Sequence, residues 1–206
     1  KAARTPADFL AAAHQGLADC FAGGVTTVAD TGDTGAVIEA LAQCGGSGIA
    51  YHEVFGPDPT QRDESLAGLR ERVAELRRFA RERVRLCVSP HAPYSVSGPL
   101  YHAVAQWART ERLPLAVHVA ESAAESALLA SGTGPFADMW NRRGIPPVSP
   151  MGQTPIGWLE RHGVLGPDTL CIHVIRASRA DMQRLATTDC PIATCPLSNV
   201  MHQHGD

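Results

Sequence analysis

The sequence predicts an α/β fold in which parallel strands are joined by helices. Short runs of β-branched and apolar residues alternate with longer segments in which apolar residues recur every three or four positions. Glycine pairs such as Gly23-Gly24 and Gly45-Gly46 end the helical segments before the next strand begins. This alternation is typical of a parallel sheet, because parallel strands need long crossover connections.

Six strands are predicted in chain order, at residues 25–30, 49–55, 84–89, 115–119, 169–174 and 192–195. Helices are expected at residues 7–22, 35–44, 66–79, 98–112 and 179–187, with a longer helical and loop segment from 120 to 165. The last strand has no predicted helix after it. Six strands fit either a closed (β/α)8 barrel or an open doubly wound sheet. No G-x-G-x-x-G follows a strand and no P-loop is present, which disfavours the nucleotide-cofactor version of the open sheet.

The composition indicates one medium-sized globular domain. The chain has 206 residues, 44% of them hydrophobic, and a net charge of −3. These values exclude disordered and fibrous classes, and the acidic balance gives no electrostatic footprint for nucleic acid. No stretch approaches the ~20 apolar residues of a membrane span. We therefore expect neither nucleic acid nor a membrane as a partner.

The first residues and the cysteines favour a cytoplasmic location. The opening segment lacks the apolar core of a signal peptide. Six cysteines are spread singly along the chain, and none forms a C-x-x-C pair or a cluster with zinc-finger spacing. Isolated cysteines inside apolar runs are typical of reduced core residues.

Polar residues gather at the predicted carboxyl ends of the strands, where α/β folds bind ligands. Three consecutive strands, the third to the fifth of the six, each place a histidine within or just past an apolar run. One such histidine is more commonly structural, whereas three on one sheet favour a shared site. The strand-end residues are Asp30, His52, Glu53, His91, His118, Glu121, His173 and Asn199.

The spacing of His118 and Glu121 suits metal-assisted hydrolysis. An imidazole at a strand end can coordinate a divalent metal, and a carboxyl group three residues later can transfer protons to and from a substrate. His173, one strand further, could bind the metal or contact the activated water. The alternative for Glu121 is a charge at a helix N-terminus, stabilised by the helix dipole.

Five segments in one order resemble the amidohydrolase superfamily. The resemblance extends over nearly all 206 residues and is to the branch that includes 5-methylthioadenosine/S-adenosylhomocysteine deaminase, aminodeoxyfutalosine deaminase and chlorohydrolases. It implies a (β/α)8 TIM barrel of the metal-dependent hydrolase type. The segments are Ser89-Pro-His-Ala-Pro-Tyr-Ser-Val-Ser97, His118-Val-Ala-Glu-Ser122, Ser131-Gly-Thr-Gly-Pro-Phe136, His173, and Cys195-Pro-Leu-Ser-Asn199.

The resemblance also implies a role for each matching residue. His118 is similar to the metal-binding histidine of the fifth strand, and Glu121 to the general acid/base that protonates a ring nitrogen of the substrate. His173 resembles the catalytic sixth-strand histidine that orients the hydrolytic water. His91 resembles the substrate-binding histidine that contacts the nucleoside portion. Asn199 is expected to support its loop.

The implied reaction is hydrolytic deamination of an adenosine-type nucleoside or related amino-heterocycle. Water activated by one divalent metal, Zn²⁺ in preference to Fe²⁺, attacks the ring carbon that bears the amino group, and ammonia leaves. Related enzymes commonly form homo-oligomers, although the sequence does not give the oligomeric state. The alternatives are a triazine-type chlorohydrolase or aminohydrolase, and a truncated, non-catalytic barrel fragment.

The chain departs from the family pattern at both ends. The H-x-H pair of the first strand and the aspartate of the eighth are absent from their expected places, so residues 1–206 are interpreted as one partial barrel domain with about strands two to seven. His202-Gln203-His204 has the H-x-H spelling but follows the seventh strand, and we expect a loop or disordered tail there. Asp206 follows Asn199 too closely to replace the eighth-strand aspartate, because a crossover needs at least ~10 residues.

Overall fold

The computed structural model describes residues 3–148 and 151–205. The chain divides into two compact units. Residues 1–53 and 67–89 form the first unit, and residues 54–66 and 90–206 form the second. Asp206 lies outside the described residues.

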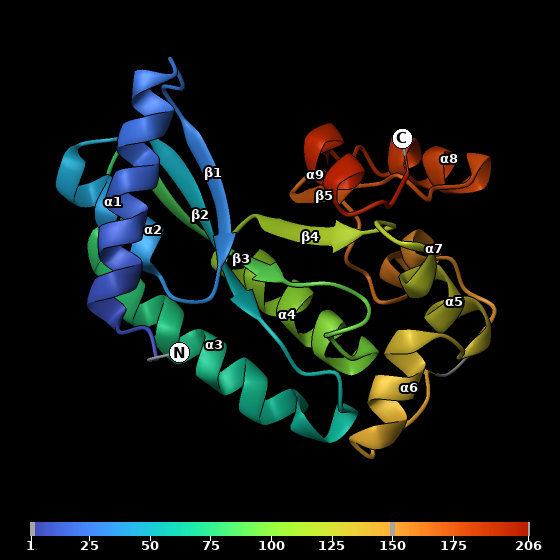
Figure 1. The fold of residues 1–206 in the computed structure, drawn as a ribbon. Coiled ribbons are helices and arrows are strands. Elements are labelled where there is room, and N and C mark those ends of the chain that lie inside the picture. The colour runs from blue at the N-terminus through green and yellow to red at the C-terminus, as the bar shows by residue number, and fades with distance from the viewer. Residues whose placement is uncertain (1–2, 149–150, 206) are drawn as a thin grey trace. The chain divides into compact units, whose positions relative to one another are not determined.

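The first unit alternates helices and parallel strands, as expected from the sequence (Figure 1). Its strands follow the order β1-β2-β3, and β1 pairs with β2 in parallel register from Val28 opposite Gly48 to Gly32 opposite His52. The helix α3 begins in the second unit and ends in the first. The elements are α1 (Pro6–Ala22), β1 (Val28–Gly32), α2 (Ala36–Cys44), β2 (Gly48–Val54), α3 (Arg62–Leu76), η2 (Arg77–Phe79) and β3 (Val84–Pro90).

The start of α1 and the start of β1 follow from local chemistry. Thr5 caps α1 by accepting a hydrogen bond from the backbone N–H of Asp8, whose side chain accepts one from the Thr5 backbone in return. The first strand was predicted from Val25, but β1 begins at Val28. The prediction was wrong because the N–H of Val25 donates to the carbonyl of Cys20 at 2.9 Å, which extends the end of α1.

The core of the first unit lies between its helices and strands, and α1 packs against α2. At Gly48 the neighbouring backbone leaves no room for a side chain. A Cβ atom added there would lie 2.5 Å from the carbonyl oxygen of Val28 on the neighbouring strand. Only glycine therefore fits at the start of β2. The fully or nearly buried apolar side chains of this unit include Ile38, Leu41, Leu69, Val73, Leu76, Val84, Cys87 and Val88.

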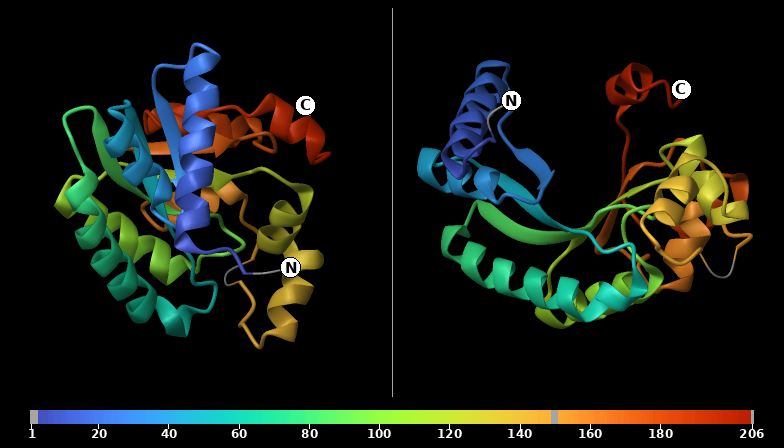
Figure 2. Two further views of the ribbon diagram at one scale, coloured as in Figure 1. Left: turned by 60° about the vertical axis from the view of Figure 1, so that its left-hand side comes forward. Right: turned by 60° about the horizontal axis from the view of Figure 1, so that its bottom comes forward.

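The second unit contains the remaining strands and most of the helices (Figure 2). Its strands follow the order β4-β5-β6, and β4 pairs with β5 in parallel from Leu115 opposite Thr169 to Val119 opposite His173. The elements are η1 (Pro59–Gln61), α4 (Gly98–Glu111), β4 (Leu115–Val119), α5 (Ala123–Ser131), α6 (Pro135–Arg142), α7 (Pro155–Arg161), β5 (Thr169–His173), α8 (Arg179–Thr187), β6 (Ile192–Ala193) and α9 (Pro196–Met201).

The last strand is shorter than predicted and is followed by a helix. β6 covers only Ile192–Ala193, and α9 starts at Pro196, where the fixed φ of proline suits the first helical turn. The expectation that no helix follows this strand was wrong. Because α9 turns the chain back, Asn199 is buried while Leu197 remains 82% exposed.

Two serine caps fix the helices that follow β4 and β5. Ser122 caps α5 by accepting from the N–H of Glu125, and Ser178 forms a reciprocal capping box with Asp181 at the start of α8. Both acidic side chains are completely buried.

In the described part of the chain, no helix combines the length and apolar character needed to cross a bilayer.

Candidate active site

His118 and His173 meet at the carboxyl ends of two paired strands. His118 is the fourth residue of β4 and His173 is the last residue of β5, where it stands opposite Val119. The Nδ1 atom of His118 lies 3.4 Å from the Nε2 atom of His173. His173 is buried and His118 is half-buried. The structure thus brings together two of the residues that the sequence predicted as a site.

The backbone at the end of β5 is left-handed at two successive non-glycine residues. His173 has φ 75° and Val174 has φ 55°. Such conformations are unfavourable for residues with a Cβ atom and persist where surrounding contacts determine them. The N–H of Val174 donates to the carbonyl of Val119 at 3.0 Å, which holds this turn against the end of β4.

Glu121 reaches the same two strands from the turn after β4. Its Oε1 atom lies 3.4 Å from Nε2 of His173, and its side chain is 17% exposed. The residue before it, Ala120, also has a positive φ, of 52°. Glu121 precedes the cap residue Ser122 and lies outside α5, so the first acidic residue inside that helix is Glu125.

Asn199 contacts the predicted catalytic histidine directly. Its Oδ1 atom lies 3.0 Å from Nδ1 of His173, and its side chain is 5% exposed. Asn199 was expected to support its loop. The structure adds a bond to the imidazole, so that one ring nitrogen of His173 faces Asn199 and the other faces His118 and Glu121.

His204 also approaches Glu121. Its Nε2 atom lies 3.4 Å from Oε1 of Glu121, and its carbonyl oxygen accepts a hydrogen bond from Nη2 of Arg176 at 2.9 Å. The segment from His202 to His204 is the expected loop, and the two imidazole rings stack with centroids 5.6 Å apart. No role was predicted for this loop, but the structure places His204 beside Glu121.

His91 lies beside His118 within a group of aromatic rings. The His91 ring centroid is 5.1 Å from that of His118, and its Nδ1 atom lies 2.6 Å from Oγ of Ser95. Phe55 lies 4.8 Å from His91 on one side, and Tyr94 lies 5.7 Å away on another. Tyr94 in turn stacks on a ring of α6, that of Phe136, with centroids 4.1 Å apart and an interplanar angle of 5°.

Three aromatic residues near His91 were not predicted as site residues: Phe55, Tyr94 and Phe136. Signals for two of them existed, since Tyr94 and Phe136 lie inside the segments that carry the family resemblance. Phe55 follows β2 immediately and therefore occupies a strand end. Aromatic rings at such positions present flat apolar faces against which a planar heterocycle can stack.

A cavity of about 390 Å³ opens next to the site in the second unit. His173 and Asn199 line it from β5 and α9, so the imidazole that contacts Glu121 also faces a space of small-molecule size. The remaining lining residues are Val174, Ile175, Thr194, Pro196, Val200 and Gly205.

The other strand-end residues, Asp30, His52 and Glu53, belong to the first unit. Asp30 is the middle residue of β1 and not its end, which corrects the prediction. Burial raises the pKa of Asp30, and the Glu53 carboxylate adds to the rise. Burial lowers the pKa of His52, and the charge of Arg72 adds to that fall. In both residues, burial thus favours the uncharged form.

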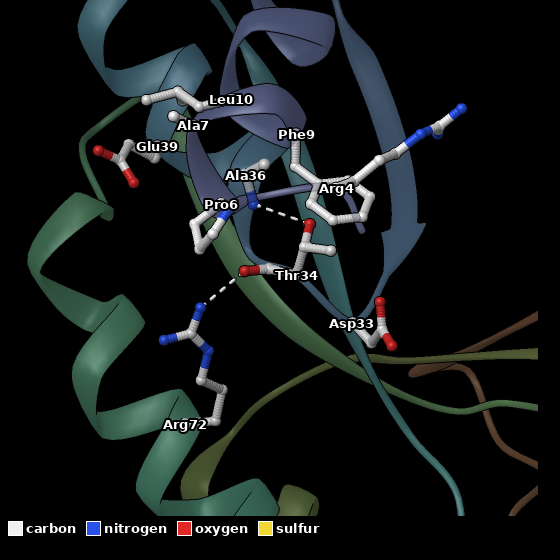
Figure 3. A pocket seen from close by; sticks show the side chains of 10 residues that line it. All are labelled: Arg4, Pro6, Ala7, Phe9, Leu10, Asp33, Thr34, Ala36, Glu39 and Arg72. Carbon is white, nitrogen blue, oxygen red and sulfur yellow. Dashed lines mark hydrogen bonds between the residues drawn. The ribbon is translucent and has the colours of Figure 1, made fainter. Parts of the chain in front are cut away.

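A cavity of about 530 Å³ in the first unit lies at the starts of α1 and α2 (Figure 3). Arg72 donates from Nη2 to the carbonyl of Thr34 at 2.6 Å, and the Thr34 hydroxyl accepts from the N–H of Ala36 at 3.2 Å. Arg4 and Glu39 also line it. None of the predicted site residues does, so we interpret this cavity as a feature of helix packing and not as the catalytic site.

The donor atoms of the second unit fit a divalent metal. Zinc binds imidazole nitrogens at about 2.0–2.1 Å in tetrahedral geometry, which separates two such nitrogens by about 3.3 Å. The observed separation of Nδ1 of His118 and Nε2 of His173 is 3.4 Å. Imidazole ligands also suit iron, so the donor chemistry admits both metals. His118 and His173 could therefore hold one metal, with the Glu121 carboxylate beside it.

Comparison with known proteins identifies the family. The sequence pattern of the amidohydrolase family matches residues 5–200. This chain belongs to the amidohydrolase family. Its relatives include an aminodeoxyfutalosine deaminase of Deinococcus radiodurans, 34% identical over 165 residues, and a 5-methylthioadenosine/S-adenosylhomocysteine deaminase of Desulfitobacterium hafniense, 24% identical over 190 residues. They confirm the predicted resemblance to metal-dependent hydrolases.

Two solved structures share the fold. Helicobacter pylori aminofutalosine deaminase matches 92% of the chain with a TM-score of 0.82 at 20% identity. A Xanthomonas campestris adenosine deaminase with bound zinc matches 98% with a TM-score of 0.77 at 20% identity. The predicted α/β class is confirmed: six parallel strands with their helices correspond to part of a (β/α)8 barrel.

The chain covers less than half of these proteins. The match to the Deinococcus protein includes 74% of this chain but 38% of that protein. The match to the Desulfitobacterium protein includes 92% of this chain but 40% of that protein. The two structures are covered to 47% and 43% of their lengths.

Proposed function

We propose that this chain carries the catalytic half of a metal-dependent hydrolase that deaminates an adenosine-type nucleoside or related amino-heterocycle. The observation that carries the proposal is the contact of Glu121 with His173, next to His118, at the carboxyl ends of β4 and β5. Its family membership and its deaminase relatives support the reaction class. The reaction consumes one water, replaces a ring amino group by an oxo group and releases ammonia.

Each residue takes the role that its position allows. His118 would hold the metal, zinc in preference to iron, which supplies charge that makes a water molecule more acidic. Glu121 would carry a proton to the ring nitrogen of the substrate, since its carboxylate lies 3.4 Å from His173. His173, held by Asn199, would orient the water or share the metal.

Substrate binding is proposed for His91 and the aromatic rings around it. The imidazole of His91 is held by Ser95 and flanked by Phe55 and Tyr94, an arrangement that could stack and hydrogen-bond a nucleoside. Residues 1–206 are proposed as one partial barrel domain. A cytoplasmic location, supported by six free cysteines, and homo-oligomeric assembly are proposed as well.

The test uses the full-length protein that contains this chain. Metal content is measured by inductively coupled plasma mass spectrometry, and ammonia release is measured with a panel of adenosine-type substrates. We expect about one metal per chain, lost in His118→Ala and retained in His102→Ala, which changes an exposed histidine of α4. Glu121→Gln should retain the metal and lose about 10² to 10⁴ in kcat, while the exposed control Glu64→Gln should not.

Two results would redirect the proposal. Chloride or ammonia release from triazines without nucleoside turnover would favour the triazine-type alternative; His91→Ala should raise KM for a nucleoside and barely change KM for a small triazine. Absence of both metal and ammonia release across the panel would overturn the enzyme assignment and favour a non-catalytic binding module.

A further inference from the structure

Glu125 is a buried carboxylate that the proposed reaction does not use. It lies in the first turn of α5, and its side chain has no exposed surface. A buried carboxylate is costly unless its oxygens accept hydrogen bonds. Its position in a helix beside the site, seven residues after His118, makes its hydrogen-bond partners informative.

Both oxygens of Glu125 accept hydrogen bonds from the turn that carries Glu121. Oε1 accepts from the backbone N–H of Ala120 at 2.9 Å, and Oε2 accepts from the backbone N–H of Glu121 at 2.9 Å. The Ser122 hydroxyl accepts from the N–H of Glu125 at 3.2 Å and so fixes the start of the same helix. The carboxylate therefore clamps two consecutive peptide groups.

The clamped turn has an unfavourable backbone conformation. Ala120 has φ 52°, a left-handed value that alanine rarely adopts, and its side chain is fully buried. This turn sends the chain out of β4 and brings the Glu121 carboxylate to 3.4 Å from His173. The N–H of Arg176 also donates to the Ala120 carbonyl at 2.8 Å, so the turn is tied to the segment after β5 as well.

We propose that Glu125 is a positioning residue that holds the Ala120–Glu121 turn and thereby sets the direction of the Glu121 carboxylate toward His173. The inference rests on the proposed function and deepens it. Glu125 touches neither His118 nor His173 through any described hydrogen bond, so it acts through the backbone of Glu121 and not on the substrate.

The two-oxygen clamp makes glutamine a precise probe. A glutamine side chain has the same size but offers one acceptor oxygen and one N–H₂ donor. In Glu125→Gln, one of the two backbone N–H groups would face a donor, and a buried polar group would lose its partner. The turn at Ala120 is then free to relax, and the Glu121 carboxylate moves away from His173.

The chain offers a matched control in Asp181. Its side chain is also completely buried, and it caps α8 by accepting from the Ser178 backbone at 3.0 Å, the Ser178 hydroxyl at 2.7 Å and the Thr154 hydroxyl at 2.6 Å. Asp181→Asn removes one acceptor, and the ion pair with Arg184 at 3.2 Å, from a buried helix cap that does not contact Glu121. It therefore reports the cost of damaging a buried carboxylate cap away from Glu121.

The experiment compares Glu125→Gln, Asp181→Asn and the unchanged full-length protein. We expect Glu125→Gln to lower kcat about a hundredfold with KM changed less than about twofold, while Asp181→Asn lowers thermal stability and leaves kcat within about twofold. Imidazole NMR signals of His173 should shift in Glu125→Gln only. Unchanged kcat and unchanged His173 signals in a folded Glu125→Gln protein would overturn the proposal.

A second variant tests the mechanism of positioning. Glycine adopts φ 52° with little strain, so Ala120→Gly added to Glu125→Gln should restore part of kcat and of the His173 signals. A direct chemical role for Glu125 predicts no restoration. If the unchanged protein releases no ammonia, the proposed function fails, whereas the His173 signals of the variants still decide whether Glu125 positions Glu121.

Discussion

Oδ1 of Asn199 lies 3.0 Å from Nδ1 of His173, and both side chains are buried. An amide oxygen accepts hydrogen bonds, so this contact keeps the proton of a neutral imidazole on Nδ1 and leaves the Nε2 lone pair directed at His118 and Glu121. A metal-site or general-base histidine is commonly oriented by such a partner. Asn199, on the short helix α9, therefore favours one tautomer of His173 on β5.

Asn199→Leu should release the ring of His173. Leucine has a similar size but accepts no hydrogen bond, so both the orientation and the tautomer of the imidazole are lost. We expect kcat to fall about 10- to 100-fold while the fold is retained, as judged by circular dichroism. Asn141→Leu, at an exposed position near the end of α6, is the control and should leave kcat unchanged. Equal activity of the two variants would contradict the role of Asn199.

The loop after α9 allows a comparison between two neighbouring histidines. His204 contacts Glu121, whereas the described contacts of the His202 ring are with His204 itself. His204→Ala removes one of the side chains that hold the Glu121 carboxylate, and we expect kcat to fall severalfold. His202→Ala should have a smaller effect. A fall in kcat of the same size in both variants would indicate a general disturbance of the loop.

Glu125 should make stability depend on pH. Burial raises the pKa of Glu125 from 4.5 to about 7, while hydrogen bonds from the backbone of residues 120–122 act to lower it. Between these pH values the folded protein keeps a proton there that the unfolded chain has lost, so stability falls as the pH rises through this window. Over the whole window, the free energy of unfolding should fall by about 3 kcal/mol.

Urea unfolding of the full-length protein at pH 5 and pH 7.5 measures this effect. The difference in unfolding free energy between the two pH values should be larger in the unchanged protein than in Glu125→Gln, whose side chain does not titrate. Asp181→Asn provides the reference, because hydrogen bonds from Thr154 and Ser178 lower the pKa of Asp181 below 3.8 against the effect of its burial. Asp181 therefore stays ionised at both pH values, and Asp181→Asn should keep the pH dependence of the unchanged protein. An identical pH dependence in Glu125→Gln and the unchanged protein would contradict a raised pKa of Glu125 in the folded protein.

Gly48→Ala should destabilise the first unit. The added Cβ atom would lie 2.5 Å from the Val28 carbonyl oxygen, so β1 and β2 must separate, at a cost of about 1–3 kcal/mol. Gly16→Ala is the matched control, because no atom lies within 4 Å of its added Cβ atom in α1. Alanine favours helix there, so its unfolding free energy should rise by up to about 1 kcal/mol. Thermal unfolding of both variants checks the difference.

The sequence was sufficient to predict the alternation of elements and the meeting of His118, Glu121 and His173. Those predictions depend on local periodicity and on the rule that parallel strands direct their carboxyl ends to one edge. The start of β1 was misplaced because Val25, a good strand residue, is hydrogen-bonded into the end of α1. Local propensity does not reveal such a competition.

The contacts of Asn199, His204 and Glu125 could not be predicted for a different reason. Each depends on how a turn folds back: α9 returns Asn199 to β5, and Gln203, with φ 57°, redirects the chain toward Glu121. Glu125 occupies a helix position where an acidic residue is ordinarily exposed and interacts with the dipole. Its complete burial depends on packing around α5, which no pattern in the sequence displays.

The strand order has a consequence for how this protein is made. In each unit every strand pairs with the strand that precedes or follows it in the chain, as β4 does with β5 and β5 with β6. Each new strand therefore finds its partner already synthesised, and the segment that must close is the crossover between two consecutive strands and not a longer part of the chain. The polypeptide can add one strand and helix after another while it leaves the ribosome, without waiting for its distant end.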